Sequence, residues 1–497
     1  MLKTIIAREF LNNILDLRFI VSLVLCIVIT IACIMILVHD YQQQMKDYNA
    51  RVNIEDEILD NYAKAEHARL FGMLRIQKPP ERFRPLIIGI QGNENVGSFD
   101  DNPLPILFPP LDFLFIVTII MSLLAMLFSH DAIAGERQNG TLRLMISNSI
   151  SRTTILFGKF IGGSASLIIP FILVLLAGVL YISVNPAIQW DGSVWLELAL
   201  LTAASIIFIT LFYLLGLMVS TFSRYSSTSI LNCLFLWVLL ILVIPNVCTY
   251  ISASLCRIPS IKETERKENE IEKNALKVVR KHMNEAAKKF KLKYGGLFSE
   301  FESMEYGGIG TFLFLERLAS STHEKAAEQR AETDPEFKAM MDAFRMEYKI
   351  AMKELRRIYE ELGYFKLTKD MRTKSIRQTK LAKNLACISP FANFVYIARD
   401  LTGTGLRSLD YFEQIKDEYE EQFQSYATEK ISDARKKNPA IDEESLLDVR
   451  DRPRFAFKEE ALKGKLNEVL PYWGILVSFN VVFFIAAFAR FMRYDVR

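Results

Sequence analysis

The sequence has few residues of the kinds that bind metals, and they are scattered along the chain. It contains five histidines and six cysteines in 497 residues. A zinc site needs such residues at short, fixed spacings, and no pair of histidines or cysteines has one. We therefore expect no metal and no other cofactor bound by this chain itself.

A phosphate-binding loop is also missing. Such a loop places glycines before a Gly-Lys pair that Ser or Thr follows, so that backbone N–H groups surround the phosphates. Neither Gly158-Lys159 nor Gly464-Lys465 meets this requirement, and the glycine-rich Thr402–Gly405 has no Lys. A Gly-x-Ser-x-Gly sequence, which would carry a serine nucleophile, does not occur either. We predict that the chain is not an enzyme and has no ATPase site of its own.

An excess of one charge is lacking too. The 60 basic and 57 acidic residues leave a net charge of +3, and both signs are mixed along the polar stretches. This balance does not favour a nucleic-acid partner.

The apolar residues are gathered into six long runs. Each run approaches or exceeds the roughly 20 residues that cross a bilayer core as a helix. The runs are Phe19–Val38, Phe113–Ser129, Leu156–Tyr181, Leu196–Phe222, Ile230–Tyr250 and Tyr472–Phe488. The sequence therefore predicts an all-α membrane protein with six transmembrane helices and a large, mainly helical insertion between the fifth and the sixth. Acidic Glu9 and Asp16 precede the first run, which favours an uncleaved span over a signal peptide.

The charges predict which parts lie in the cytoplasm. With a cytoplasmic N-terminus, the short cytoplasmic pieces hold eleven bases and five acids, whereas the opposite loop Ser183–Ser193 carries only Asp191. This is the positive-inside pattern. We expect a protein of the cell's inner membrane with both termini in the cytoplasm and the insertion outside.

These assignments divide the chain into segments. They are an amphipathic interfacial helix (1–18), spans at 19–38, 113–129, 156–182, 196–222, 229–250 and 472–491, an extracytoplasmic loop (39–112), a cytoplasmic segment (130–155) and an extracytoplasmic helical domain (251–471).

The two large outer segments contain recognisable local patterns. Apolar residues recur at helical spacing over 271–290 and 337–362, and a further helical stretch covers Tyr411–Lys436. We expect the aromatic residues of that stretch to be core rather than a ligand site. The run Pro85–Ile90 is short and β-prone, and predicts a strand.

Two cysteines lie just outside the predicted spans, at the ends of one helical insert. An oxidising compartment would allow Cys256 and Cys387 to form a disulfide. The sequence does not fix the distance between them, so the bonded and the reduced states both stay open.

The stretch Gly135–Phe160, between the second and third runs, is unusually polar. Local physics allows two interpretations: a short helix whose charged ends meet a soluble partner, or a plain hydrophilic connection. Glu136, then Gly140-Thr141-Leu142, with Ser151-Arg152 and Gly158-Lys159 downstream, resembles the first cytoplasmic loop of ABC-2 type permeases. In that family the loop forms the coupling helix that docks on a separate ATP-binding subunit.

Other parts of the chain resemble the same family. Ile6–Phe10, together with Asp16 and Arg18, is similar to its interfacial helix. Leu214–Ser220 resembles its fourth span. Ser389-Pro390-Phe391 and Leu401–Thr404 are similar to elements of a branch with large extracytoplasmic insertions, some of whose members serve multi-copper enzyme maturation.

The resemblance implies a permease subunit of an ABC exporter. Its partners would be an ATP-binding subunit, which binds ATP and Mg, a second permease copy or paralogue, the lipid bilayer and a protein outside the membrane. The implied coupling residues are Glu136, Gly140, Thr141, Leu142 and Arg143, and those of the interfacial helix are Ile6, Arg8, Glu9, Phe10 and Arg18. The alternative is a membrane-anchored mechanotransmission, signalling or scaffold protein that moves no solute.

Overall fold

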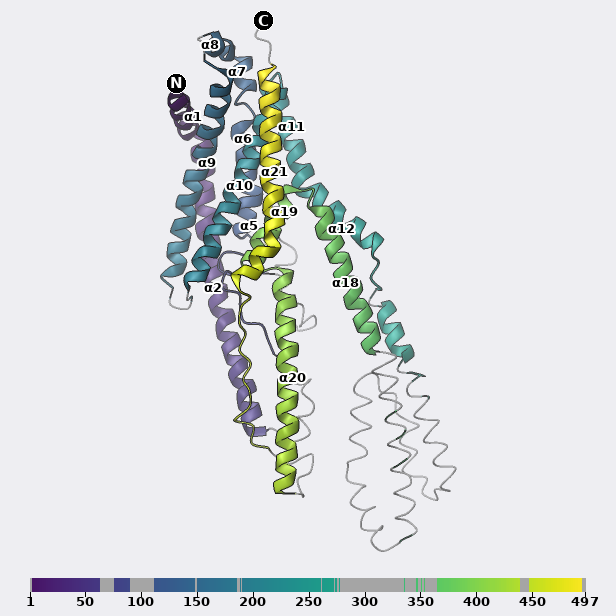
Figure 1. Ribbon diagram of the computed structural model, residues 1–497. Helices are drawn as coiled ribbons and strands as arrows, with labels where there is room; N and C mark the ends of the chain where they lie inside the picture. The colour runs from purple at the N-terminus through teal and green to yellow at the C-terminus, as the bar shows by residue number, and fades with distance from the viewer. Residues whose placement is uncertain are drawn as a thin grey trace. The chain divides into compact units, whose positions relative to one another are not determined.

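In the described part of the chain, all regular secondary structure is helical. The computed structural model describes residues 2–62, 76–89, 111–147, 150–185, 188, 190–260, 262–271, 273–274, 277, 335, 346, 350, 353, 364–438 and 447–493. In chain order its elements are α1 (Leu2–Leu15), α2 (Leu17–Tyr62), α5 (Phe113–Phe115), the π-helical turn η2 (Ile116–Met121), α6 (Ser122–Ser129), α7 (Ala134–Gln138), α8 (Thr141–Ser147), α9 (Arg152–Ser183), α10 (Gly192–Phe222), α11 (Ser226–Val238), the π-helical turn η3 (Leu239–Val243), α12 (Ile244–Leu255), α18 (Tyr364–Ala386), α19 (Pro390–Leu401), α20 (Leu406–Lys437) and α21 (Leu462–Met492) (Figure 1).

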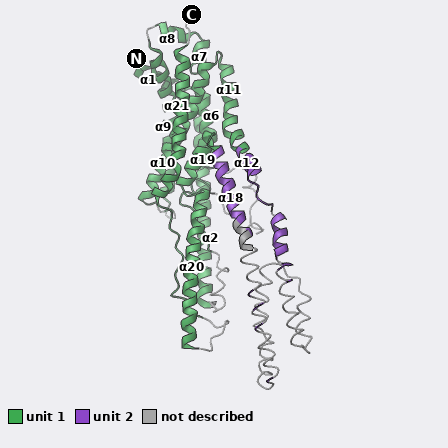
Figure 2. Ribbon diagram, turned by 45° about the vertical axis from the view of Figure 1, so that its right-hand side comes forward, with its two compact units in different colours: residues 1–247, 386–497 green, residues 248–385 purple. Residues whose placement is uncertain are grey.

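The chain divides into two compact units. The first comprises Met1–Val247 and Ala386–Arg497, and the second comprises Cys248–Leu385 (Figure 2). Within the second unit, the Ser252 hydroxyl donates to the Gln378 carbonyl at 2.6 Å, and the Gln378 amide donates to the Cys256 carbonyl at 3.0 Å. These bonds join the end of α12 to α18.

Among the described residues, six helices are long and apolar enough to cross a membrane. They cover Phe19–Asn61, Phe113–Gln138, Arg152–Ser183, Gly192–Phe222, Ser226–Leu255 and Leu462–Met492. Helices α18, α19 and α20 lie between the fifth and the sixth in the chain. The predicted fold class, six spans with a helical insertion before the last, is confirmed.

Polar caps set where the spans begin. At the start of α9 the Ser151 hydroxyl accepts from the Thr154 N–H, and at the start of α10 the Asp191 carboxylate accepts from the Val194 N–H at 3.2 Å. Each satisfies an N–H that has no partner within its helix. Bonds from Ser193 and Arg82 also lower the pKa of Asp191, to about 2.

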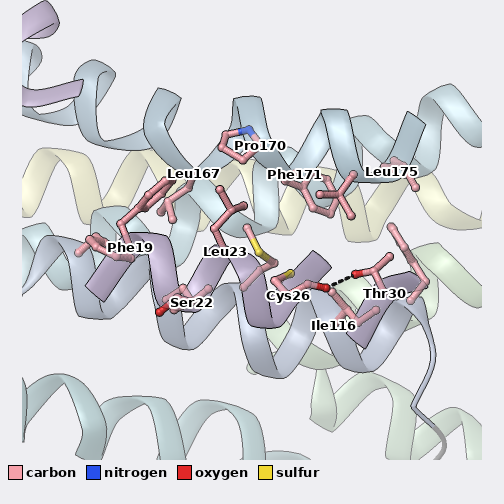
Figure 3. A pocket seen from close by; sticks show the side chains of 15 residues that line it. Phe19, Ser22, Leu23, Cys26, Thr30, Ile116, Leu167, Pro170, Phe171 and Leu175 are labelled. Atoms are coloured by element: carbon pink, nitrogen blue, oxygen red, sulfur yellow. Dashed lines mark hydrogen bonds between the residues drawn. The ribbon is translucent and has the colours of Figure 1, made fainter. Parts of the chain in front are cut away.

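The first three spans enclose a small apolar pocket beside η2 (Figure 3). Its side chains come from α2, from the second span and from α9 around Pro170. The Thr30 hydroxyl in its wall donates to the Cys26 carbonyl at 2.7 Å. None of the described residues that line it carries a charge, and apart from the hydroxyl-bearing Ser22 and Thr30 its wall offers mainly apolar contacts.

The strand predicted at Pro85–Ile90 is wrong for its described residues, 85–89. Residues 82–86 instead form turns, in which the Phe83 carbonyl accepts from the N–H groups of Leu86 at 2.9 Å and Ile87 at 2.8 Å. Phe83, Leu86 and Ile87 are at most 2% exposed in the main core. The apolar run satisfies its backbone locally and packs against the spans, so it needs no partner strand.

Predictions for the insertion have different outcomes. The helices predicted at 271–290 and 337–362 fall largely outside the described residues. The helix predicted at Tyr411–Lys436 is confirmed by α20. Its Phe412 and Phe423 are buried in a small core, so the expectation that these aromatic residues are core is confirmed for them.

Candidate coupling site

The segment between the second and third spans is fixed to the end of α10. The Ser220 hydroxyl accepts from the N–H groups of Ile133 at 3.0 Å and Ala134 at 2.9 Å, where α7 begins. The Arg137 guanidinium donates to the Ser223 carbonyl at 2.8 Å and, more weakly, to that of Thr221 at 3.4 Å. Both contacts satisfy helix-terminal groups that would otherwise lack partners. The segment is therefore held by the fourth span as well as by its own neighbours in the chain.

A glycine turn sets the direction of α8. Gly140 has φ +74°, a left-handed conformation that glycine adopts without a Cβ penalty. The Thr141 hydroxyl then donates to the Glu136 carbonyl at 3.2 Å and to the Glu136 carboxylate. Gly140 and Thr141 thus fix the angle between α7 and α8.

Helix α8 has an anchoring residue and an outward face. Leu142 is 0% exposed in a small core that includes Ile133, Ile155, Leu156, Leu214, Leu217 and Phe491. Arg143 is exposed, and Leu144 is 64% exposed. An anchored helix that presents a cation beside an apolar side chain suits contact with a second protein.

A buried lysine joins residues from two separate motifs. The side chain of Lys159 on α9 is 4% exposed, and its Nζ lies 3.1 Å from Glu9 Oε1 and 3.4 Å from Glu136 Oε1. Glu9 belongs to α1 and Glu136 to α7. The structure thus brings together two residues that were predicted for different elements. Sequence reasoning missed the role of Lys159, for which the only signal was its place in the Gly158-Lys159 motif.

Two glycines allow α1 to lie against α9. A Cβ at Gly158 would come within 2.5 Å of Ile5 Cγ2, and one at Gly162 within 2.8 Å of the Ile6 carbonyl oxygen. Small residues four apart permit such close helix packing in membranes. Helix α1 therefore rests directly on the third span.

The predicted residues of the interfacial helix occupy different environments on α1. Ile6, Glu9 and Phe10 are half-buried, whereas Arg8 is exposed. The side chain of Arg18 lies outside the described part of the structure.

A tyrosine links the third span to the fourth at the same level. Tyr213 on α10 is 0% exposed, and its hydroxyl donates to the Lys159 carbonyl at 3.1 Å. The backbone of Lys159 is thus held by α10, while its side chain is held by α1 and α7.

The predicted disulfide and the question of a metal site concern other parts of the chain. Cys256 belongs to the second unit and Cys387 to the first, so their disulfide stays a prediction. In the described residues, no group of three or more His, Cys, Asp or Glu side chains could hold a metal ion.

Comparison with known proteins identifies the family. The six apolar spans define a multi-pass membrane protein. Residues 3–496 match the model of the family described as "ABC-2 family transporter protein". The chain therefore belongs to the ABC-2 family and is a transporter permease subunit.

Two curated relatives match a short stretch of the chain. Each is named "Probable ABC transporter permease protein NosY". The protein of Stutzerimonas stutzeri is 45% identical over 47 residues, and that of Pseudomonas aeruginosa is 43% identical over 47 residues. The match covers 10% of this chain and 17% of each relative.

Proposed function

We propose that the chain is the permease of an ABC exporter and that segment 130–155 docks on a separate ATP-binding subunit. ATP and Mg would be bound by that subunit. The observation that carries this proposal is the construction of α8, where buried Leu142 anchors the helix and Arg143 and Leu144 face outward. The match to the ABC-2 family over residues 3–496 supports a partner of this kind.

The proposal includes an orientation in the membrane. An even number of spans puts both termini on one side, and the six candidate spans of the described residues support this arrangement. The excess of bases in the termini and in segment 130–155 favours the cytoplasm for that side. The helical insertion then lies outside the inner membrane, where it could meet a protein partner.

The internal contacts of the site supply a route for motion. Displacement of α7 by the ATP-binding subunit would move Glu136, and through Lys159 it would move α1 and α9. Since Tyr213 holds the Lys159 backbone, α10 would follow. We propose that this change in the spans, in a pair of permease copies or paralogues, drives export.

A second candidate function is mechanotransmission without solute transport. It is favoured by α2, which runs unbroken from the first apolar run to Tyr62. ATPase activity without cargo movement in vesicles would select this alternative.

Co-purification tests the docking surface. We expect Arg143→Ala to lower the amount of ATP-binding subunit recovered with the permease by several-fold, because it removes a cation from the outward face of α8. The matched control is Arg224→Ala, which removes another exposed arginine outside α7 and α8. Equal recovery with Arg143→Ala, Leu144→Ala and the double variant would sink the coupling assignment.

A further inference from the structure

The first span continues far beyond its apolar run. Helix α2 has 46 residues, and its sequence contains neither proline nor glycine. Its outer part, from His39 to Tyr62, is about 24 residues or roughly 36 Å long at 1.5 Å per residue. Since the usual causes of a kink are absent from its sequence, we expect the helix to move as one piece. A tilt of the span would then displace its far end.

A buried arginine holds that far end. The side chain of Arg452 is 1% exposed and donates to the Asp56 carboxylate at 2.5 Å and to the Asp60 carboxylate. It also donates to the Asp56 carbonyl at 3.3 Å. Two carboxylates four residues apart on a helix repel each other, and the single positive charge of the guanidinium between them offsets that repulsion in part. Without Arg452 this face of α2 would lose its charge partner.

The segment that carries Arg452 is bound to α20 on its other side. We call residues 447–457 the strap. The Tyr419 hydroxyl donates to the Pro453 carbonyl at 2.9 Å, and Tyr426 and Lys430 bind the Asp451 carboxylate at 2.5 and 2.7 Å. Ile76, Phe412, Phe423, Ala427, Ile431, Leu447 and Val449 form a shared core. The strap and α20 therefore behave as one body, and Figure 1 shows α2, the strap and α20 side by side.

The contact between α2 and this body is narrow. Among the described residues of α2, Leu59 packs against the shared core, and it is only partly buried. The charged link through Arg452 is nearby, at Asp56 and Asp60. The strap continues at residues 458–461 into α21, the last span.

We infer that Arg452 is a positioning residue that pins the outer end of α2 to α20, so that movement of the first span is delivered outside the membrane. The inference rests on the proposed function for the source of the motion, since α1 leads directly into α2. Beyond the proposed function, the inference states which part of the protein moves outside the membrane. The body formed by α20 and the strap follows α2 during the nucleotide cycle.

Distances between spin labels test the pin in the full chain with its ATP-binding subunit. Labels go on the exposed sites Asn53→Cys on α2 and Ser425→Cys on α20, with Cys256→Ser and Cys387→Ser as background. With Arg452 present, we expect one narrow distance distribution that is the same in the nucleotide-free and ATP-trapped states. With Arg452→Met, the width should at least double and the mean should differ between the two states. The inference would be overturned if Arg452→Met left the distance distribution unchanged. It would also be overturned if the distribution broadened but was the same in the nucleotide-free and ATP-trapped states.

Two control variants address the chemistry of the link. Lys430→Met removes a more exposed partner of the same strap, its side chain being 32% exposed, and should leave the distribution narrow. Arg452→Glu combined with Asp56→Lys and Asp60→Lys restores opposite charges and should narrow it again; failure of this rescue counts against a charged pin. Co-purification and ATPase activity of the same samples report the proposed function separately, because Arg452 belongs to the strap and not to segment 130–155.

Discussion

Lys159 shows how a single residue can organise a site that is built from distant parts of the chain. Its ammonium lies between Glu9 and Glu136, whose side chains are 18% and 27% exposed. A lysine buried this deeply needs ionised partners, because desolvation of its charge would otherwise be costly. The pairing makes the position of α1 depend on that of α7.

Loss of this lysine should destabilise the protein. We expect Lys159→Met to cost about 3 kcal/mol, since breaking a buried pair leaves carboxylates without a partner. Partial exposure of both glutamates argues for the lower end of the usual range. Thermal unfolding in detergent measures the change, with Lys267→Met, which removes an exposed pair with Glu263, as the matched control.

A second variant separates charge from packing. Adding Glu9→Gln and Glu136→Gln to Lys159→Met removes the unpaired charges and should restore part of the lost stability. If the triple variant is no more stable than Lys159→Met, the loss comes from packing and the charged pairing contributes little.

At the scale of elements, the long helices could be predicted from the sequence, whereas the conformation of short segments could not. The six apolar runs and the 3.6-residue period of α20 are strong signals, and both are confirmed. The strand predicted for residues 85–89 was wrong, because a short apolar run fits a strand and a buried turn equally well. The chain forms a turn here and not a strand, because the apolar side chains of the turn pack against the spans.

The contacts within the coupling site could be predicted only in part. The family resemblance pointed to Glu9 and Glu136, but a contact across 150 residues, such as that of Lys159 with Glu9, leaves no periodic trace in one sequence. The same holds for Arg452, whose partners lie 396 and 392 residues away.

The close packing of α1 on α9 can be tested by a substitution at the contact. A methyl group at Gly162 would meet the backbone of Ile6, which has little freedom to move aside. We therefore expect Gly162→Ala to push α1 away from α9 and to cost about 1–3 kcal/mol through overpacking. Trypsin cleavage in α1, at exposed Arg8, should become several-fold faster.

A matched substitution shows whether the effect comes from that contact. Gly474 on α21 has nothing within 4 Å of where its Cβ would lie, so Gly474→Ala should leave both stability and cleavage unchanged. Equal cleavage of the Gly162→Ala and Gly474→Ala proteins would show that α1 does not depend on close approach to the third span.

At the scale of the whole molecule, the proposed function requires α8 and α20 to lie on opposite sides of the membrane. In the described part of the chain, three spans lie between them: α9, α10 and α11–α12. If each of these described spans crosses the membrane once, an odd number places α8 and α20 on opposite sides. Positive charge predicts that α8 is the cytoplasmic one.

Labelling of single cysteines in intact cells checks this arrangement. With Cys256→Ser and Cys387→Ser as background, Ser425→Cys on α20 should react with a membrane-impermeant maleimide added outside, once the outer envelope is permeable. Ser147→Cys on α8 should react only after the inner membrane is opened, because the reagent cannot cross the apolar spans. Both positions are exposed in the structure, so a failure to react reflects the membrane and not burial. Labelling of Ser147→Cys from outside would contradict the orientation and, with it, any contact between α8 and a cytoplasmic ATP-binding subunit.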